Sequence, residues 1–388
     1  MLVANLARFA CCCLLGGALV ACNNDPPAPT AEPSSSALSS NSATPANPIV
    51  LTGSAVATLA LPASAFVQPS ATASAIASAS APAAPATPTH TIVDDSVISQ
   101  AKNGVLTPAI ADSVLPAGAP ARVTLLEAGA APREVISYKL GAASSQTITL
   151  TSEDETRMES PQAPNGPQVI ATPPISVGLQ VAAEDGQSDV PFTVTVLSTK
   201  VTPSSDPKLA PMIDQLGKQV EGMKGMAFKF SATSHGMLRE LKVVPPANAT
   251  PAVKQVSEQM QSTLQTIVLQ LPDGELGVGA KWQVVQRLTI GIDVLQWTTY
   301  TLTKREGTKL ELTAETGQLA TSAAMQAGGG RTGTVDSFES QGTTTLQLDL
   351  TKLLPVSATN TTKAKLKLSS GIESLNLQTT RKMLLTSG

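Results

Sequence analysis

Side chains suited to acid–base or nucleophilic catalysis are few in this chain of 388 residues. It contains 2 histidines, His90 and His235, and the second falls in a predicted turn, Ser234-His235-Gly236. A Ser-His-Asp or Cys-His site would have to use one of them, and the sequence has no GxSxG elbow. Ser205-Asp206-Pro207-Lys208 matches SxxK only formally, because the SDN and KTG companion motifs are absent. We therefore expect a protein that is not an enzyme.

Motifs for phosphate or metal binding are equally weak. The glycine-rich stretch 328–334 lacks the GK[ST] ending of a phosphate loop, so we expect a hairpin connection there. The acidic run Glu153-Asp154-Glu155 lacks the ligand spacing of a calcium loop. We expect no metal site and no cofactor other than the covalent lipid discussed below.

The 4 cysteines all lie near the N-terminus, at Cys11, Cys12, Cys13 and Cys22. Residues 1–21 carry one charge, Arg8, followed by an apolar run too short to span a bilayer, which needs about 20 apolar residues. This layout is typical of a secretory signal peptide. Its removal would leave Cys22 alone, so the mature chain could form neither an internal disulfide nor a cysteine zinc site.

Cys22 directly follows Leu19, Val20 and Ala21. This stretch resembles the lipobox of bacterial lipoproteins, in which the cysteine becomes the lipidated first residue of the mature chain. The resemblance implies a diacylglyceryl thioether and an N-acyl chain on Cys22, and several acyl chains anchor a protein firmly. Asn23 follows Cys22. In the lipoprotein sorting rule of enteric bacteria, Asp at this position retains the protein in the inner membrane, and this chain has Asn instead. The resemblance therefore implies a lipid-anchored protein of the cell envelope, at the outer membrane.

Composition argues against nucleic acid as a partner. The formal net charge is −3, no run of basic residues occurs, and aromatic residues make up 3% of the chain. Nucleic-acid binding normally shows a basic patch and aromatic stacking platforms. The expected partners are the membrane, through the anchor, and a lipid or a protein of the envelope.

Residues 22–90 are dominated by Pro, Ala, Ser and Thr after the lipidated cysteine. Such segments cannot bury enough apolar surface to fold, so we predict a disordered tether. A flexible coil of about 68 residues has an r.m.s. reach of roughly 45 Å. Either this reach matters for function or the segment is a low-complexity insertion of no fixed length.

Residues 91–388 show the period-2 alternation of antiparallel strands with one apolar face. Leu346, Leu348 and Leu350 are one example. Turn residues separate the strands at Asp185-Gly186, Ser234-His235-Gly236, Asp273-Gly274 and Glu306-Gly307. Further strands are predicted near 122–127, 134–140, 145–151, 174–184, 190–199, 281–289, 292–304 and 309–320. A faint internal similarity allows a division into two lobes, 91–245 and 246–388.

Two stretches have helical spacing instead. One begins after Ser205 and Asp206, and its apolar positions run from Leu209 to Met223, before Gly225. The other runs from Val253 to Leu271, with Thr250 as N-cap and Pro251 at the first helical position. Both are amphipathic, so we expect both to pack on the sheet.

The predicted fold is mainly β (α+β), a curved one-sided antiparallel sheet or half-barrel with two amphipathic helices packed on it. It looks like an uncharacterised class of β-rich bacterial lipoproteins, and its layout is similar to half-barrel carriers of lipoprotein-sorting and lipid-transfer families. That resemblance implies a non-enzymatic protein that binds an apolar ligand or acyl chain between sheet and helices. The alternative is a protein-interaction or scaffolding module. The candidate ligand face consists of Met212, Leu216, Val220, Met223, Met260 and Leu264, although methionines also fill ordinary cores.

Overall fold

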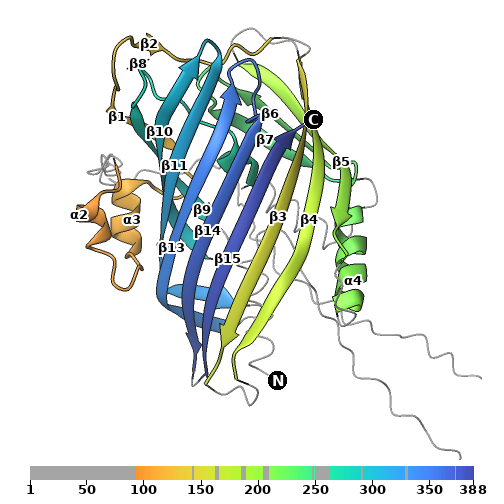
Figure 1. Cartoon of the computed structure of the whole chain (residues 1–388). Coiled ribbons are helices and arrows are strands. Elements are labelled where there is room, and N and C mark those ends of the chain that lie inside the picture. Colours follow the sequence, from red (N-terminus) through yellow and green to blue (C-terminus); the bar gives the residue numbers. More distant parts are fainter. Residues whose placement is uncertain are drawn as a thin grey trace, which may run out of the picture. The chain divides into compact units, whose positions relative to one another are not determined.

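A computed structural model gives the fold of the chain (Figure 1). The structure describes residues 92–388 except for 142–143, 162–165, 185–188, 204–208, 247–248, 250–262, 290–291, 328–330 and 372. The predicted signal peptide, Cys22 and the predicted tether therefore lie outside the described residues. So do the turn at Asp185-Gly186 and most of the second predicted helix.

The described part of the chain is mainly β and is built on one open antiparallel sheet (Figure 1). Its 13 strands follow the spatial order β1-β9-β10-β11-β13-β14-β15-β3-β4-β5-β6-β7, and β12 pairs with β13. The predicted fold class is therefore confirmed. The strands are β1 (Arg122–Glu127), β3 (Ser145–Glu159), β4 (Gln168–Ala183), β5 (Val190–Val201), β6 (Ala227–Ala232), β7 (Leu238–Val244), β9 (Lys281–Thr289), β10 (Asp293–Glu306), β11 (Lys309–Ala320), β12 (Ala324–Ala327), β13 (Arg331–Asp349), β14 (Ser357–Ser370) and β15 (Glu373–Ser387).

Spatial order in the sheet departs from chain order at two places. β1 pairs with β9, and β15 pairs with β3, so distant parts of the sequence become neighbours. These two pairings join strands from before and after residue 246 within a single sheet. The suggested duplication into two lobes stays a prediction.

One predicted strand is much shorter than expected. Residues 134–140 were expected to form a strand, but only β2 (Glu134–Val135) does so, pairing with β8 (Glu275–Leu276). Beyond it the backbone bonds to loops: the Tyr138 amide donates to Ser234 O over 2.8 Å, and the Lys139 amide donates to Leu350 O over 2.8 Å. The alternating apolar residues therefore belong to a segment that connects distant parts of the sheet and does not continue as a strand.

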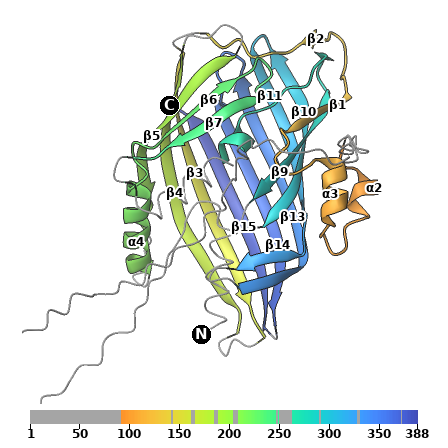
Figure 2. The same cartoon turned by 180° about the vertical axis from the view of Figure 1, so that it is seen from behind.

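The two faces of the sheet differ in polarity, as the alternation predicted. We call the face that carries Leu302, Leu346 and Leu385 the inner face. Cross-strand register places these leucines in one row that also contains Leu312, Ala358 and Leu150. β6 and β7 cross over this inner face in the view from behind (Figure 2). The side chains on the inner face are therefore enclosed by the chain's own strands.

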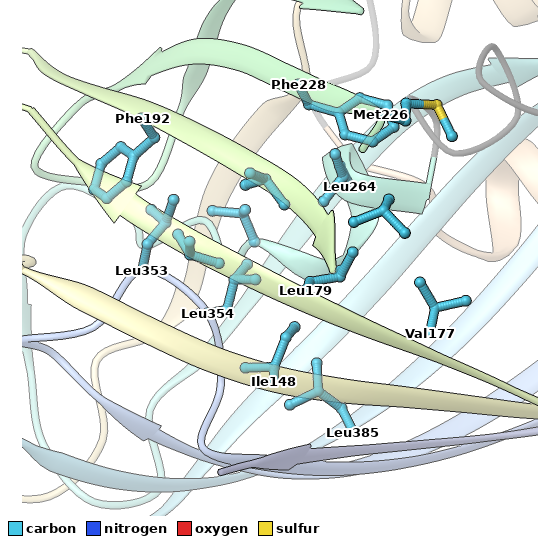
Figure 3. Close-up of a cluster of buried hydrophobic side chains, with 14 of the residues drawn as sticks. Ile148, Val177, Leu179, Phe192, Met226, Phe228, Leu264, Leu353, Leu354 and Leu385 are labelled. Carbon is cyan, nitrogen blue, oxygen red and sulfur yellow. The ribbon is translucent and has the colours of Figure 1, made fainter. Parts of the chain in front are cut away.

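The first predicted amphipathic helix is present as α4 (Ala210–Glu221). Leu216 and Val220 are its buried residues, and they join a core cluster with apolar side chains of β4, β5 and β6. Figure 3 shows part of this cluster, including Leu179, Phe228 and Leu264. Phe192 and Phe230 are a directly opposed cross-strand pair whose rings stack with centroids 5.9 Å apart.

Residues 263–271 of the second predicted helix are described. Residues 263–267 are helical, and the helix ends there, four residues before the predicted end at Leu271. Leu264 and Val268 belong to the same core cluster as α4, and Ile267 packs against it. The described end of this helix therefore packs on the apolar core, as its amphipathic pattern predicted.

Two short helices that the sequence pattern did not predict cover part of the outer face. They are α2 (Asp95–Ile98) and α3 (Pro108–Val114), which pack against Val285, Leu295 and Leu319. Arg287 fixes α3 to the sheet, since its Nη1 donates to Asp112 Oδ1 over 2.9 Å and to Leu115 O over 3.1 Å. The outer face of β9, β10 and β11 is therefore covered where it carries Val285, Leu295 and Leu319.

Candidate ligand cavity

A cavity of about 280 Å³ lies against the inner face of the sheet. Its floor comes from β10, β11, β13, β14 and β15, and residues 263–269 contribute another wall through Thr263, Thr266, Ile267 and Leu269. This volume is near the lower end of the range of about 300–1,000 Å³ that is typical of small-molecule sites. The cavity is therefore large enough for one segment of an acyl chain or a compact apolar group.

Two adjacent rows of polar side chains cross the inner face and form the middle of the cavity floor, and we call them the polar belt. One row contains Gln296, Gln318, Ser340, Thr379 and Thr156, with Ala364 between Ser340 and Thr379. The other contains Thr298, Thr316, Thr362, Arg381 and Asp154, with Gly342 between Thr316 and Thr362. Cross-strand register alone brings these residues together from six strands.

Most members of the polar belt bond to one another. Gln318 Nε2 donates to Gln296 Oε1 over 2.7 Å. The hydroxyls of Thr298 and Thr316 lie 3.0 Å apart, and those of Thr156 and Thr379 lie 3.2 Å apart. Buried polar groups are normally paired in this way, because an unpaired group loses its hydration without compensation.

Arg381 carries the only charge among the described side chains that line the cavity. Its Nε donates to Oδ1 of Asp154 over 2.6 Å, directly across β15 and β3. The Asp154 side chain is 8% exposed and that of Arg381 22%. The carboxylate therefore neutralises the guanidinium, and the two together add no net charge to the cavity.

Ser340 is the exception to the pairing of the polar belt. Its side chain lines the cavity and is 4% exposed, yet Oγ has no hydrogen-bond partner. Leaving a buried hydroxyl unpaired costs about 1–3 kcal/mol. An unpaired group of this kind is expected where a ligand or a water supplies the missing bond.

Apolar side chains enclose the polar belt on both sides. The leucine row that includes Leu346 and Leu385 lies toward one end of the strands. Toward the other end, Phe338 is in register with Leu366 and belongs to a second core cluster. A ligand that fills the cavity would therefore meet hydrocarbon at both ends and hydrogen-bonding groups in the middle.

Tyr300 forms part of the cavity wall and stacks on Trp282, with ring centroids 5.5 Å apart. Burial raises the pKa of the Tyr300 phenol to about 12, because the protein interior disfavours the phenolate. Trp282 is fixed in turn, since its Nε1 donates to Gln270 O over 2.9 Å. The wall is thus a rigid aromatic pair that stays neutral at physiological pH.

The sequence-predicted ligand face lies in the packed core. Leu216, Val220, Met223 and Leu264 are buried in the cluster that joins α4 to the sheet, and Met212 packs against it. None of these five lines the cavity. Met260 lies outside the described residues.

The polar belt was not predicted, although the sequence carries a signal of it. The inner positions of β13 read Phe338, Ser340, Gly342, Thr344 and Leu346, so polar or small residues interrupt an otherwise apolar set. Such an interruption on the buried face of a strand is unusual enough to mark a site. The partners of β13 in the sheet were needed to recognise the belt.

His235 has no catalytic arrangement around it. Its Nδ1 lies 3.4 Å from Ser234 Oγ, and its Nε2 lies 3.6 Å from Asp273 Oδ1. The Asp273 side chain is 98% exposed, whereas the carboxylate of a catalytic triad is buried and orients the imidazole. His235 and Gly236, which has φ +79°, form the tight turn between β6 and β7 that the sequence predicted.

The described residues contain no cluster of three or more His, Cys, Asp or Glu side chains positioned to hold a metal ion. None of the helices in the described ranges combines the length and apolar character that a membrane crossing requires. Comparison with models of protein families and with curated proteins finds no match to this chain.

Proposed function

We propose that this protein is a lipid-anchored lipoprotein of the cell envelope, at the outer membrane, whose β domain binds an apolar ligand or acyl chain without catalysing a reaction. The observation that carries the ligand proposal is the cavity of about 280 Å³ between the inner face and residues 263–269. A well-packed core of this composition would leave few voids larger than a water molecule.

The lining of the cavity supports an apolar ligand. Leu150, Leu346 and Leu385 from the sheet and Ile267 and Leu269 from the opposite wall supply hydrocarbon contact. Burial of an acyl chain is worth about 0.8 kcal/mol for each CH2 removed from water. About ten buried methylenes would therefore contribute roughly 8 kcal/mol, the free energy that corresponds to micromolar binding.

The anchor is proposed from the lipobox resemblance of Leu19, Val20, Ala21 and Cys22. A lipid on Cys22 would hold the chain at the membrane, and residues 23–90 would connect it to the β domain. Together these parts would keep the cavity within reach of membrane lipid.

The edge strand β7 supports docking of a partner protein less well. An exposed sheet edge can pair with a partner strand, but natural edges carry charges and bulges that prevent this. β7 carries Arg239, Glu240 and Lys242, Glu240 has φ +55°, and the register shifts opposite it. These features are typical of a protected edge.

Ala364 offers a direct test, because its side chain lines the cavity floor. We would purify the full chain from membranes and measure bound lipid by native mass spectrometry. Ala364→Leu should fill the cavity and abolish lipid retention, whereas the control Thr343→Leu adds the same side chain to an exposed outer position of the neighbouring strand β13 and should retain lipid. Absence of lipid from the wild-type chain, or equal retention by both variants, would refute a ligand in this cavity.

A further inference from the structure

We infer that the cavity selects an uncharged amphipathic ligand, an acyl chain bearing a neutral ester, amide or hydroxyl group, and that Ser340 Oγ binds this polar group. The inference rests on the proposed function and specifies the chemistry of the ligand.

The hydroxyl of Ser340 has no hydrogen-bond partner in the described part of the protein, and Ser340 lines the cavity. Its Oγ is buried without a hydrogen bond in the middle of the floor. An aliphatic ligand would leave this hydroxyl unpaired, as it is in the free protein. A ligand with an oxygen or N–H at this position would satisfy it, and binding would gain from a bond that the free protein lacks.

The charge balance of the polar belt favours a neutral group. Arg381 bonds to Asp154 over 2.6 Å, and the other described members of the belt are hydroxyls and amides. A buried carboxylate would need an unbalanced positive charge to offset its desolvation. The Arg381–Asp154 pair supplies no such unbalanced charge, so a free fatty acid should bind less well than its neutral ester.

Ser340 has a small cross-strand neighbour that leaves room for the polar group. The residue paired with Ser340 on β14 is Ala364, and the next inner position along β13 is Gly342. The space above Gly342 is taken by the Thr362 side chain, since a Cβ on Gly342 would lie only 3.0 Å from Thr362 Oγ1. Thr362 and Thr379 stand on the next strands and line the same space, so a bound ester or hydroxyl would meet several hydroxyl groups.

The test compares monooleoylglycerol with oleate, two ligands with the same acyl chain and different head groups. We would titrate each amphiphile into the full chain carrying Cys22→Ser by calorimetry at pH 8. Each amphiphile would be kept below the concentration at which it aggregates. We expect monooleoylglycerol to bind at least about tenfold more tightly. Ser340→Ala should weaken that binding about 3- to 10-fold, the value of one neutral hydrogen bond. The control is Ser337→Ala on the outer face of the same strand, which should leave both affinities unchanged.

The same variant separates a ligand contact from a structural role. Because Ser340 Oγ has no partner in the protein, Ser340→Ala should leave Tm unchanged or raise it by up to about 3 °C. A clear fall in Tm would show that the hydroxyl is bonded within the protein and would overturn the assignment. Oleate binding as tightly as monooleoylglycerol would overturn the selection for a neutral ligand.

Failure of this inference can be distinguished from failure of the proposed function. If Ser340→Ala binds monooleoylglycerol with wild-type affinity while Ala364→Leu binds neither amphiphile, the cavity binds acyl chains and the role of Ser340 is wrong. If the wild-type chain binds neither amphiphile, both proposals fail.

Discussion

Arg381 and Asp154 lie 227 residues apart in the sequence and form a direct cross-strand ion pair, with Nε and Oδ1 separated by 2.6 Å. The pair joins β15, the last strand of the chain, to β3, its neighbour in the interior of the sheet. It also balances the charge in the floor of the cavity. The same contact therefore bears on the pairing of β15 with β3 and on the character of the ligand.

Asp154→Asn is expected to destabilise the protein and to change its ligand preference. Removing one partner of a fully buried ion pair costs about 3–5 kcal/mol, and the partial exposure of Arg381 should reduce this to roughly 2–3 kcal/mol. The variant removes the negative charge beside Arg381, so oleate should gain affinity relative to monooleoylglycerol. Urea unfolding and calorimetry measure the two effects.

The matched control for this variant is Glu153→Gln on the outer face. Glu153 Oε1 lies 3.7 Å from Lys382 Nζ, and both side chains are exposed, so the expected cost is below about 1 kcal/mol. Equal costs for the two variants would contradict the structural importance of the buried pair.

The raised pKa of Tyr300 predicts that the protein loses stability at alkaline pH. Its pKa is raised to about 12 in the folded state, whereas the pKa of a tyrosine in the unfolded chain is near 10. Between these values the unfolded state loses the proton while the folded state keeps it, so stability falls as pH rises. Tyr300→Phe should reduce the fall between pH 10 and 12 by about 1–2 kcal/mol in urea unfolding. Identical pH dependence in the two proteins would exclude burial of the phenol.

Gly236→Ala tests the rim at which the β6–β7 turn meets the cavity wall. A Cβ at this position would overlap the carbonyl oxygen of Leu269 and contact the ring of Tyr138. Gly307 also has positive φ, but a Cβ added there would have no atom within 4 Å, so Gly307→Ala should cost only about 1–2 kcal/mol of backbone strain. Gly236→Ala should cost at least about 2 kcal/mol more, by thermal or urea unfolding. Equal losses would show that the two segments are not in contact.

Cys22→Ser tests the anchor. The wild-type chain should fractionate with membranes and carry the mass of a lipid, whereas the variant should be released and lack this mass. Cys12→Ser is the control, since residue 12 would leave with the signal peptide and the mature mass should not change. Membrane association of Cys22→Ser without a mass difference from the wild type would refute lipidation.

Local sequence pattern predicted most of the strands because side-chain alternation directly reports a half-buried sheet. β1, β9 and β11 have the predicted bounds. The short helix α3 was missed, although Thr107 and Pro108 repeat the cap-and-proline signal recognised at Thr250 and Pro251. Its seven residues carry too little periodicity to stand out beside longer helices.

The cavity could not be predicted in the same way. Ser340, Arg381 and Asp154 become neighbours only through the pairing of β13, β14, β15 and β3, and no local rule specifies that β15 pairs with β3. The methionines and leucines of α4 were predicted to contact a ligand because their face is apolar. The same property places Leu216 and Val220 in the core, because burial against the sheet stabilises any apolar face.

The most direct test of the central claim is a crystal structure of the protein with a monoacylglycerol whose acyl chain carries bromine. We predict an anomalous bromine peak between the inner face of the sheet and residues 263–269, with a head-group oxygen within hydrogen-bonding distance of Ser340 Oγ. Bromine located only on the outer surface, or a cavity filled by the chain's own side chains at a saturating ligand concentration, would contradict it.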